Sequence, residues 1–461
     1  MKNIIAGLVC TQDPLECCGS WLEEARGLLE ELEARAVLAP RAIGSWEEAE
    51  EAAERFAGED VELVVLGCLR LAGDGRIVEP FLRRGQTLMV WCLPEPARTG
   101  PLPLNSMTCA NLYMSSAKGL EGAPPVKWLY GAPGDPLVRR RLGVTLRALR
   151  GRRALSGAVV VQVGQTAPGF VNLRYDGEAV RKTLGVEIRE YGLETVFSDM
   201  EAADPQKTAE LARVLPQGAA RCEGTEEELV KSARLTLALE ALQERTGASA
   251  LAVSCWPEFQ RDLHVSVCLA FARLNEKGLP VSCEGDALGA AAMLAAKAMG
   301  AKAPMLMDLV AMDQEADAIS FWHCGMGVPC HGDTEGFAVT KYPADPRVLD
   351  LPGVGVDVKF AAQPVTVCRL SGKDGGRLFV CEAEIVPGPD RGFDGARGWF
   401  SRFSMEGRPM SALEFLDTAL TSGTPHHYVI APGRLEAALR EMAVRMGLET
   451  VRAMPYTDGL R

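Results

Sequence analysis

Two carboxylates and a histidine follow short apolar segments between residues 281 and 325. Glu284 follows a strand-like run that ends at Cys283, Asp308 lies in a second apolar segment, and His323 ends a third. Ligands of open α/β sheets bind at the edge where the strands end, so we expect these three side chains to share one edge of a sheet. A carboxylate in an apolar strand is costly to bury without a partner, which favours a functional role for Asp308.

These oxygen and nitrogen donors are typical of a site for a divalent cation. Carboxylate and imidazole ligands suit Mn²⁺ or Mg²⁺ better than a structural zinc ion. Zinc bound by Cys324, Cys330 and His331 is an alternative, but that segment has no Cys-x-x-Cys pair. A Cys324 nucleophile with His323 as its base is a further alternative. It is disfavoured because adjacent residues rarely reach the hydrogen-bond geometry of such a pair.

All five histidines lie beyond the first 263 residues: His264, His323, His331, His426 and His427. Metal and acid–base chemistry near neutral pH usually uses histidine, so we expect the reaction centre in the second half of the chain. His426 and His427 lie in a predicted strand, where neighbouring side chains point to opposite faces. We therefore expect only one of them to reach a given pocket.

The composition indicates a soluble globular protein. Of the 461 residues, 47% are hydrophobic and 24% are charged, and the chain is long enough for two or three domains. The net charge of −12 argues against a general nucleic-acid or anionic-membrane binder. No stretch approaches about 18 uncharged apolar residues, and the apolar run at the N-terminus is too short for a signal peptide. We predict a cytoplasmic protein with no membrane or nucleic-acid partner.

The 14 cysteines favour free thiols over a disulfide framework. They are scattered along the chain, mostly in apolar runs, where a free cysteine behaves as a small buried apolar residue. The examples are Cys10, Cys68, Cys92, Cys268 and Cys381.

The order of predicted elements indicates an α/β protein with a β-rich end. Short apolar strands alternate with helices through the first two segments, which predicts parallel sheets covered on both faces. Alternating strand candidates separated by glycine turns then predict an antiparallel sheet or small barrel. We expect two Rossmann-like parallel-sheet domains, at 1–153 and 154–333, followed by a β-rich C-terminal domain at 334–461.

Five short motifs together resemble the L-fucose/L-arabinose isomerase superfamily. They are Ser254-Cys-Trp-Pro-Glu, Pro280-Val-Ser-Cys-Glu-Gly-Asp, Met307-Asp-Leu, Trp322-His-Cys-Gly and Thr424-Pro-His-His, in this order. The resemblance implies an aldose–ketose isomerase that depends on Mn²⁺, with Mg²⁺ and Co²⁺ as alternatives, and a homo-oligomer that is a trimer or hexamer. It also implies that Glu284 and Asp308 bind the metal and move protons, that His427 completes the site, and that His323 is a further ligand, as in the arabinose branch.

The chain is shorter than typical members of that superfamily, which leaves the sugar open among free, phosphorylated and sulfonated sugars. The first domain in the superfamily often completes a neighbour's pocket, and Gln12, Trp91 and Asn105 are the candidates for such contacts here. Trp256, within the first motif, is a further candidate for substrate binding.

The chemistry of the candidate residues agrees with an isomerase. Conversion of an aldose into a ketose through an enediol moves a proton between C1 and C2. It needs a base, an acid and a Lewis acid that stabilises the charge on the two oxygens. Two carboxylates in different environments, Glu284 and Asp308, can take the acid and base roles. The alternatives are a metal-dependent epimerase or lyase, which would use the same enediolate, and a non-catalytic sugar-binding protein on the same fold.

Overall fold

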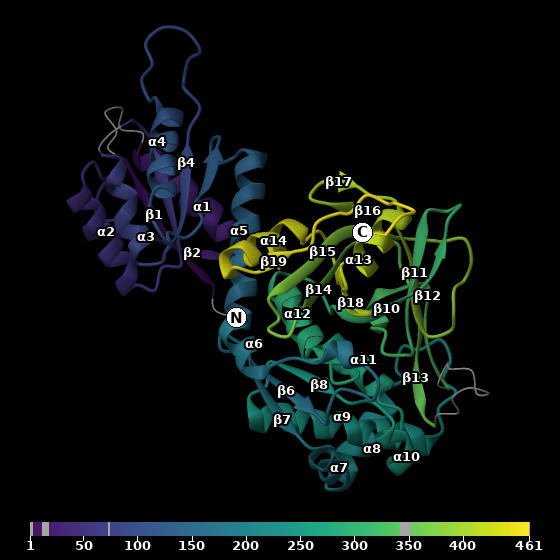
Figure 1. Ribbon diagram of the computed structural model, residues 1–461. Helices are drawn as coiled ribbons and strands as arrows, with labels where there is room; N and C mark the ends of the chain where they lie inside the picture. Colours follow the sequence, from purple (N-terminus) through teal and green to yellow (C-terminus); the bar gives the residue numbers. More distant parts are fainter. Residues whose placement is uncertain (1–2, 12–17, 72–73, 342–351, 461) are drawn as a thin grey trace. The chain divides into compact units, whose positions relative to one another are not determined.

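The computed structural model describes residues 3–11, 18–71, 74–341 and 352–460 (Figure 1). The chain divides into two compact units, Met1–Arg150 and Gly151–Arg461. The first unit contains one parallel sheet, and the second contains a parallel sheet and a larger mixed sheet. The predicted fold class, two parallel α/β sheets followed by a β-rich region, is confirmed. The predicted domain boundaries stay a prediction.

The sheet of the first unit has five parallel strands in the order β2-β1-β3-β4-β5. The strands are β1 (Ile4–Cys10), β2 (Ala34–Leu38), β3 (Leu63–Cys68), β4 (Thr87–Cys92) and β5 (Lys127–Tyr130). The helices are α1 (Cys18–Glu31), α2 (Trp46–Gly58), α3 (Glu79–Arg83), α4 (Ser106–Lys118) and α5 (Pro136–Leu155), which continues into the second unit. Helix α2 begins with a capping box, in which Ser45 and Glu48 accept each other's backbone N–H groups.

Both faces of this sheet are buried, as expected for parallel strands joined by helices. Phe56 and Phe81 belong to the apolar cluster on one face, and Trp21 and Trp91 belong to the cluster on the other. Close packing of such aromatic rings leaves no space above Gly7 in β1, where an added Cβ would lie 2.7 Å from the ring of Phe56.

We expect Gly7→Ala to lower the free energy of unfolding by about 1–3 kcal/mol, the usual cost of overpacking a core. Gly27 in helix α1 is the matched control, because nothing lies within 4 Å of an added Cβ there. Gly27→Ala should instead stabilise the protein by about 0.5–1 kcal/mol, since alanine favours the helix over glycine. Urea unfolding of both variants at one protein concentration tests this, and equal signs of the two changes would contradict it.

The smaller sheet of the second unit has four parallel strands in the order β7-β6-β8-β9. They are β6 (Val159–Val163), β7 (Glu187–Tyr191), β8 (Ala250–Val253) and β9 (Val281–Ser282). The helices around it are α6 (Gly177–Leu184), α7 (Leu193–Glu201), α8 (Pro205–Val214), α9 (Glu226–Thr246), α10 (Glu258–Leu263), α11 (Cys268–Lys277) and α12 (Ala287–Ala298).

The larger sheet has ten strands of mixed direction, and the pairing of β15 with β16 bends it into a partial ring. They are β10 (Met305–Asp313), β11 (Ala318–His323), β12 (Gly332–Lys341), β13 (Val354–Phe360), β14 (Pro364–Ser371), β15 (Arg377–Val386), β16 (Ala396–Met405), β17 (Arg408–Pro409), β18 (His427–Pro432) and β19 (Glu449–Thr450). Helices α13 (Ala412–Thr421) and α14 (Glu436–Met446) accompany it.

Strands β10 and β11 differ from the expectation. We predicted that the segments carrying Asp308 and His323 would end at the edge of the same sheet as the strand before Glu284. They are instead antiparallel neighbours inside the ten-stranded sheet, whereas β9 belongs to the four-stranded sheet. A strand's apolar pattern does not specify its partner, and here the hairpin between β10 and β11 joins the C-terminal strands.

Helix α12 connects the two sheets of the second unit. It contacts β6 and β8 of the smaller sheet and β14 and β18 of the larger one, and Figure 1 shows it between them. Every residue of the helix except Lys297 is buried, and seven of the twelve are alanine. Small side chains all around the helix let both sheets approach it closely, which brings the end of β9 near β10 and β18.

The thiol prediction is largely confirmed. Cys68, Cys92, Cys268 and Cys381 are free and buried. Cys10 is an exception, because its sulfur forms a disulfide. Among the described residues, none of the helices combines the length and the apolar content needed to cross a membrane.

Candidate metal centre

Glu284 lies in a sharp turn between β9 and α12. Its φ of 59° and the φ of 70° at Gly285 are both in the left-handed region, which is strained for a glutamate. The turn is held because the N–H of Ala167 donates to the carbonyl of Glu284 and the N–H of Gly285 donates to the carbonyl of Val253, each at 3.0 Å. An added Cβ at Gly285 would lie 2.7 Å from the carbonyl oxygen of Gln165, so this position requires glycine. The turn directs a mostly buried carboxylate toward β18.

Asp308 and His427 are paired by strand register. Asp308 lies opposite His427 in the antiparallel pair of β10 and β18, and opposite Trp322 in the pair of β10 and β11. Side chains at directly opposed positions of antiparallel strands lie on one face. Asp308 Oδ1 is accordingly 3.8 Å from His427 Nε2. His323, the last residue of β11, also reaches this place, and its ring stacks on that of His427 with centroids 5.8 Å apart.

The structure therefore brings together Glu284, Asp308, His323 and His427. Ligand atoms of Asp308, His323 and His427 all lie within 4.8 Å of one another, and so do those of Glu284, His426 and His427. The four predicted metal ligands thus lie close together, although the arrangement of the strands that carry them differs from the one expected.

The donor set fits a divalent cation. Asp308 Oδ1, His323 Nε2 and His427 Nε2 are buried, and none of these atoms forms a hydrogen bond with the described residues. Buried polar atoms without partners are costly, and several of them facing one space are unfavourable unless a cation lies between them. A mixture of carboxylate oxygens and imidazole nitrogens suits Mn²⁺ and similar ions.

Behind His427 lies a buried ion pair that the sequence did not reveal. Asp286, the N-cap of α12, accepts a hydrogen bond from His427 Nδ1 at 2.9 Å and forms a two-bond pair with the guanidinium of Arg369. The side chains of Asp286 and Arg369 are both fully buried. Burial opposes the charged form of Asp286, but Arg369 and His427 outweigh it and hold the pKa of this carboxyl well below its usual range.

His426 also contacts the site, contrary to the expectation that only one of the two adjacent histidines would. Its Nε2 lies 3.1 Å from Glu284 Oε2, and His427 Nε2 lies 3.6 Å from the same oxygen. The alternation rule fails here because β18 begins at His427, so that His426 belongs to the preceding turn. Its ring stacks on Phe170 with centroids 4.8 Å apart, and its Nδ1 lies 3.1 Å from the side-chain amide of Asn172.

The charges of the site favour an ionised Glu284. Burial opposes the carboxylate, but the hydrogen bond from His426 and the nearby imidazoles of His427 and His323 lower the pKa of Glu284. Burial likewise opposes a charged His323, yet the neighbouring Cys324 and the carboxylate of Asp308 raise its pKa. For His426, burial is outweighed by the hydrogen bond to Glu284 and the surrounding carboxylates, which raise its pKa.

The candidate substrate-binding residues have different positions. Trp256 is half-buried, with its ring 6.5 Å from that of Phe170, the residue that stacks on His426. Trp91 is fully buried in the core of the first unit, where its indole N–H donates to the carbonyl of Gly131. Asn105 is half-buried and precedes α4. Gln12 lies outside the described residues. A substrate-binding role for these four residues stays a prediction.

The zinc alternative is not supported by the geometry. His331 Nε2 lies 3.0 Å from the carbonyl oxygen of Lys302 and 3.1 Å from that of Ala303, so its ring is used in backbone hydrogen bonds. Among the described residues, the clusters that could hold a metal include neither Cys324 nor Cys330. The thiol of Cys324 lies 3.3 Å from His323 Nδ1, but its pKa is raised by the neighbouring Cys268 thiol and by burial, which disfavours a nucleophilic thiolate.

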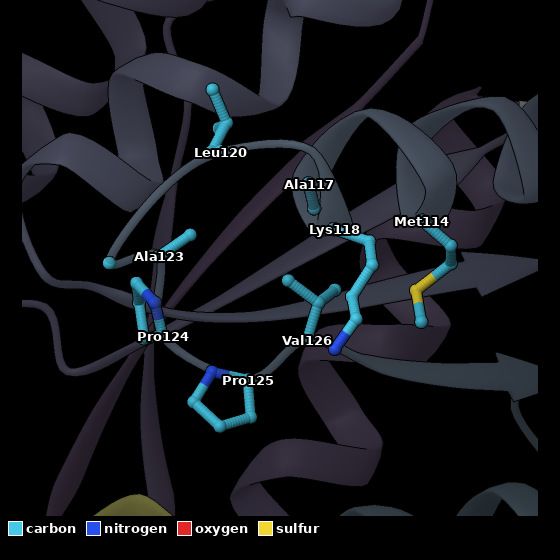
Figure 2. A pocket seen from close by; sticks show the side chains of 9 residues that line it. Met114, Ala117, Lys118, Leu120, Ala123, Pro124, Pro125 and Val126 are labelled. Atoms are coloured by element: carbon cyan, nitrogen blue, oxygen red, sulfur yellow. The ribbon is translucent and has the colours of Figure 1, made fainter.

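A separate pocket of about 320 Å³ lies in the first unit, beyond the end of α4 (Figure 2). Lys118 is the ionisable residue of its lining, which otherwise consists of Met114, Ala117, Leu120, Gly122, Ala123, Pro124, Pro125 and Val126. This lining offers one ammonium group but neither a carboxylate nor an imidazole, so it lacks the ligands that a divalent cation requires.

Several known proteins are distantly similar to this chain over most of its length. No family model matches the chain. Sulfoquinovose isomerases of Priestia aryabhattai and Priestia megaterium are each 26% identical to it over 422 residues, which cover 90% of this chain and 91% of the relative. A sulfoquinovose isomerase of Alkalicoccus urumqiensis is 24% identical over 384 residues, 82% of this chain and 83% of that protein. The wider resemblance to L-fucose and L-arabinose isomerases stays a prediction. Over most of its length, the chain is distantly similar to sulfoquinovose isomerases.

Proposed function

We propose that the protein is a metal-dependent aldose–ketose isomerase whose substrate is sulfoquinovose or a closely related sulfonated aldose. The observation that carries the proposal is the set of buried polar atoms without hydrogen-bond partners on Asp308, His323 and His427, beside the carboxylate of Glu284. The names of the similar proteins supply the substrate class.

The reaction moves a proton from C2 of the aldose to C1, while the hydroxyl proton passes from O2 to O1. Glu284 is mostly buried and held as a carboxylate by His426, so it can accept a proton from carbon and return it to the neighbouring carbon. Asp308 is the second carboxylate and can exchange the proton of the sugar hydroxyl. Mn²⁺, with Mg²⁺ and Co²⁺ as alternatives, would be held by Glu284, Asp308, His427 and His323 and would stabilise negative charge on the sugar oxygens.

His323 is the ligand of this set with the least favourable hydrogen bonding. Its Nδ1 lies 2.9 Å from the backbone N–H of Cys324, which places the ring proton on Nε2. Binding of a cation at Nε2 therefore requires this proton to move to Nδ1. There the N–H group can donate a hydrogen bond to the sulfur of Cys324, which lies at 3.3 Å. We expect His323 to contribute less to metal affinity than His427.

The test is incubation of the purified protein with Mn²⁺ and sulfoquinovose in D₂O, followed by NMR. We expect formation of the corresponding ketose with deuterium at the exchanged carbon, and loss of the reaction when a chelator removes the metal. Glucose, which lacks the sulfonate, is the matched substrate control and should react more slowly. An epimer instead of a ketose would indicate an epimerase. Binding of the sugar without exchange or product would indicate a binding protein and contradict the proposal.

The homo-oligomer predicted from the family resemblance, a trimer or hexamer, is part of the same proposal. Light scattering of the purified protein over a range of concentrations measures it directly, and a monomer at all concentrations would contradict it.

A further inference from the structure

The hydrogen bonds of His427 determine which of its ring nitrogens carries the proton. Nδ1 lies 2.9 Å from Oδ2 of Asp286, and that carboxylate forms a buried two-bond ion pair with the guanidinium of Arg369. An ionised carboxylate only accepts hydrogen bonds, so Nδ1 must carry the proton. Nε2 of the neutral ring is then an unprotonated acceptor. It is buried without a hydrogen-bond partner, 3.6 Å from Glu284 Oε2 and 3.8 Å from Asp308 Oδ1.

The hydrogen bonds of His426 have the opposite arrangement. Its Nδ1 lies 3.1 Å from the amide nitrogen of Asn172, which only donates, so Nδ1 must accept. Its Nε2 lies 3.1 Å from Oε2 of Glu284, which only accepts when ionised, so Nε2 must donate. The ring also packs against Phe170, with the two ring planes tilted by 33°. Both nitrogens of His426 are therefore used, and neither has a lone pair left for a cation.

We propose that His426 and His427 are held in opposite tautomers, so that His427 presents a bare Nε2 to a metal whereas His426 is an N–H donor that orients Glu284. The part of this proposal that concerns metal rests on the proposed function, but the tautomers follow from hydrogen bonds in the protein alone. His426 is thus a positioning residue, and the cluster of Glu284, His426 and His427 is not a set of three metal ligands.

This arrangement has a consequence for the carboxylate of Glu284. The residue is held in a strained left-handed backbone conformation, and the hydrogen bond from His426 occupies its Oε2. Since an ionised carboxylate has about four acceptor sites, others remain for a metal or substrate. Asn172 is exposed and supports the same tautomer, because its amide donates to Nδ1 of His426 and leaves the proton on Nε2.

The tautomers can be measured without any enzyme activity. We would record ¹⁵N NMR spectra of the metal-free protein labelled at histidine, and assign the signals with His426→Gln and His427→Asn. We expect a protonated Nε2 and a bare Nδ1 for His426, and the reverse for His427. The same tautomer in both rings, or a His426 ring that carries protons on both nitrogens at neutral pH, would overturn the proposal whether or not the protein is an isomerase.

Substitutions separate metal binding from positioning. Asparagine at 427 can keep the donor to Asp286 but removes Nε2. His427→Asn should therefore weaken Mn²⁺ binding about 100-fold or more. Removal of a residue that only supports a ligand already weakens metal binding by up to about 100-fold, and loss of the ligand itself should cost at least as much. His426→Leu should change Mn²⁺ affinity less than about threefold but lower kcat about 10- to 100-fold with little change in KM, because a misplaced base slows proton transfer. Titration of the metal-free variants with Mn²⁺ and kinetics on sulfoquinovose measure these effects.

Two more variants complete the design. Glutamine at 426 can place an amide N–H near the position of Nε2, so His426→Gln should recover most of the kcat that His426→Leu loses. Asn172→Leu removes the donor to Nδ1 while leaving both histidines and Glu284 in place, so the NMR spectrum should change at Nδ1 while Nε2 stays protonated. A loss of Mn²⁺ affinity in His426→Leu as large as that in His427→Asn would identify His426 as a ligand and overturn the proposal.

Discussion

Replacing Glu284 by glutamine should lower kcat on sulfoquinovose by about 10³-fold, within the range that general acid–base catalysis usually contributes. Glutamine has nearly the same shape and keeps an oxygen for the metal, but its amide cannot take a proton from carbon. The mostly buried position of Glu284 and its hydrogen bond from His426 leave little room for water to replace the carboxylate. The kinetics should be measured at saturating Mn²⁺, so that a small loss of metal affinity does not enter kcat.

Asp308→Asn should give a loss of similar size, because it removes the second carboxylate of the site. The matched controls are Glu315→Gln, at an exposed carboxylate, and Asp313→Asn, at the other end of strand β10 from the site. Both should retain the activity of the unmodified protein. If Glu284→Gln and Asp308→Asn each keep more than about one tenth of kcat, the carboxylates do not supply the acid–base catalysis expected of them.

Breaking the buried pair of Asp286 and Arg369 should have the largest effect on stability. Arg369→Met leaves a buried carboxylate without its cation, and removal of one partner of a buried pair costs about 3–5 kcal/mol. Since whole domains are stable by only about 5–15 kcal/mol, this is a large share of the total. Urea unfolding measures the loss, and titration of the folded variant with Mn²⁺ should show weaker binding, because Asp286 also orients His427.

The double variant Arg369→Met with Asp286→Asn is the control for this prediction. It removes both charges while leaving an asparagine that can still cap α12, where Asp286 accepts a hydrogen bond from the N–H of Gly289 at 2.9 Å. The double variant should therefore lose less stability than the two single variants added together. Additive losses would mean that the two side chains do not act as a pair.

Much of the architecture could be predicted from the sequence, because it depends on local patterns. Apolar strands alternating with helices predicted the parallel sheets, and capping boxes at Ser45 and Thr225 mark where two of the helices begin. The small residues of the segment after Glu284 are consistent with the tight packing of α12. Each of these features is encoded within a window of a few residues, where hydrophobic period and capping chemistry act directly.

The candidate site was predicted only in part. Glu284, Asp308, His323 and His427 could be selected by residue type and by family resemblance, and the structure brings all four together. The reason given for their proximity was wrong, because β10 and β11 pair with each other and with β16 and β18 rather than extending the smaller sheet. An apolar strand fits any sheet that buries it, so its partner depends on the whole chain.

The residues that control the protons of the site were decided by the tertiary structure. Asp286 and Arg369 lie 83 positions apart in the chain, and Glu284 and His426 lie 142 positions apart. Nothing in the sequence around Arg369 or Asn172 distinguishes them from other polar residues. Which nitrogen of a histidine carries the proton depends on whether its neighbour in space donates or accepts. For His427 this dependence is strong, because its contact with Asp286 is fully buried and water cannot replace the partner. The sequence by itself therefore determined which side chains could do chemistry. The packing of α12 between two sheets determined which hydrogen-bond partners they meet, and hence which of their atoms carry protons.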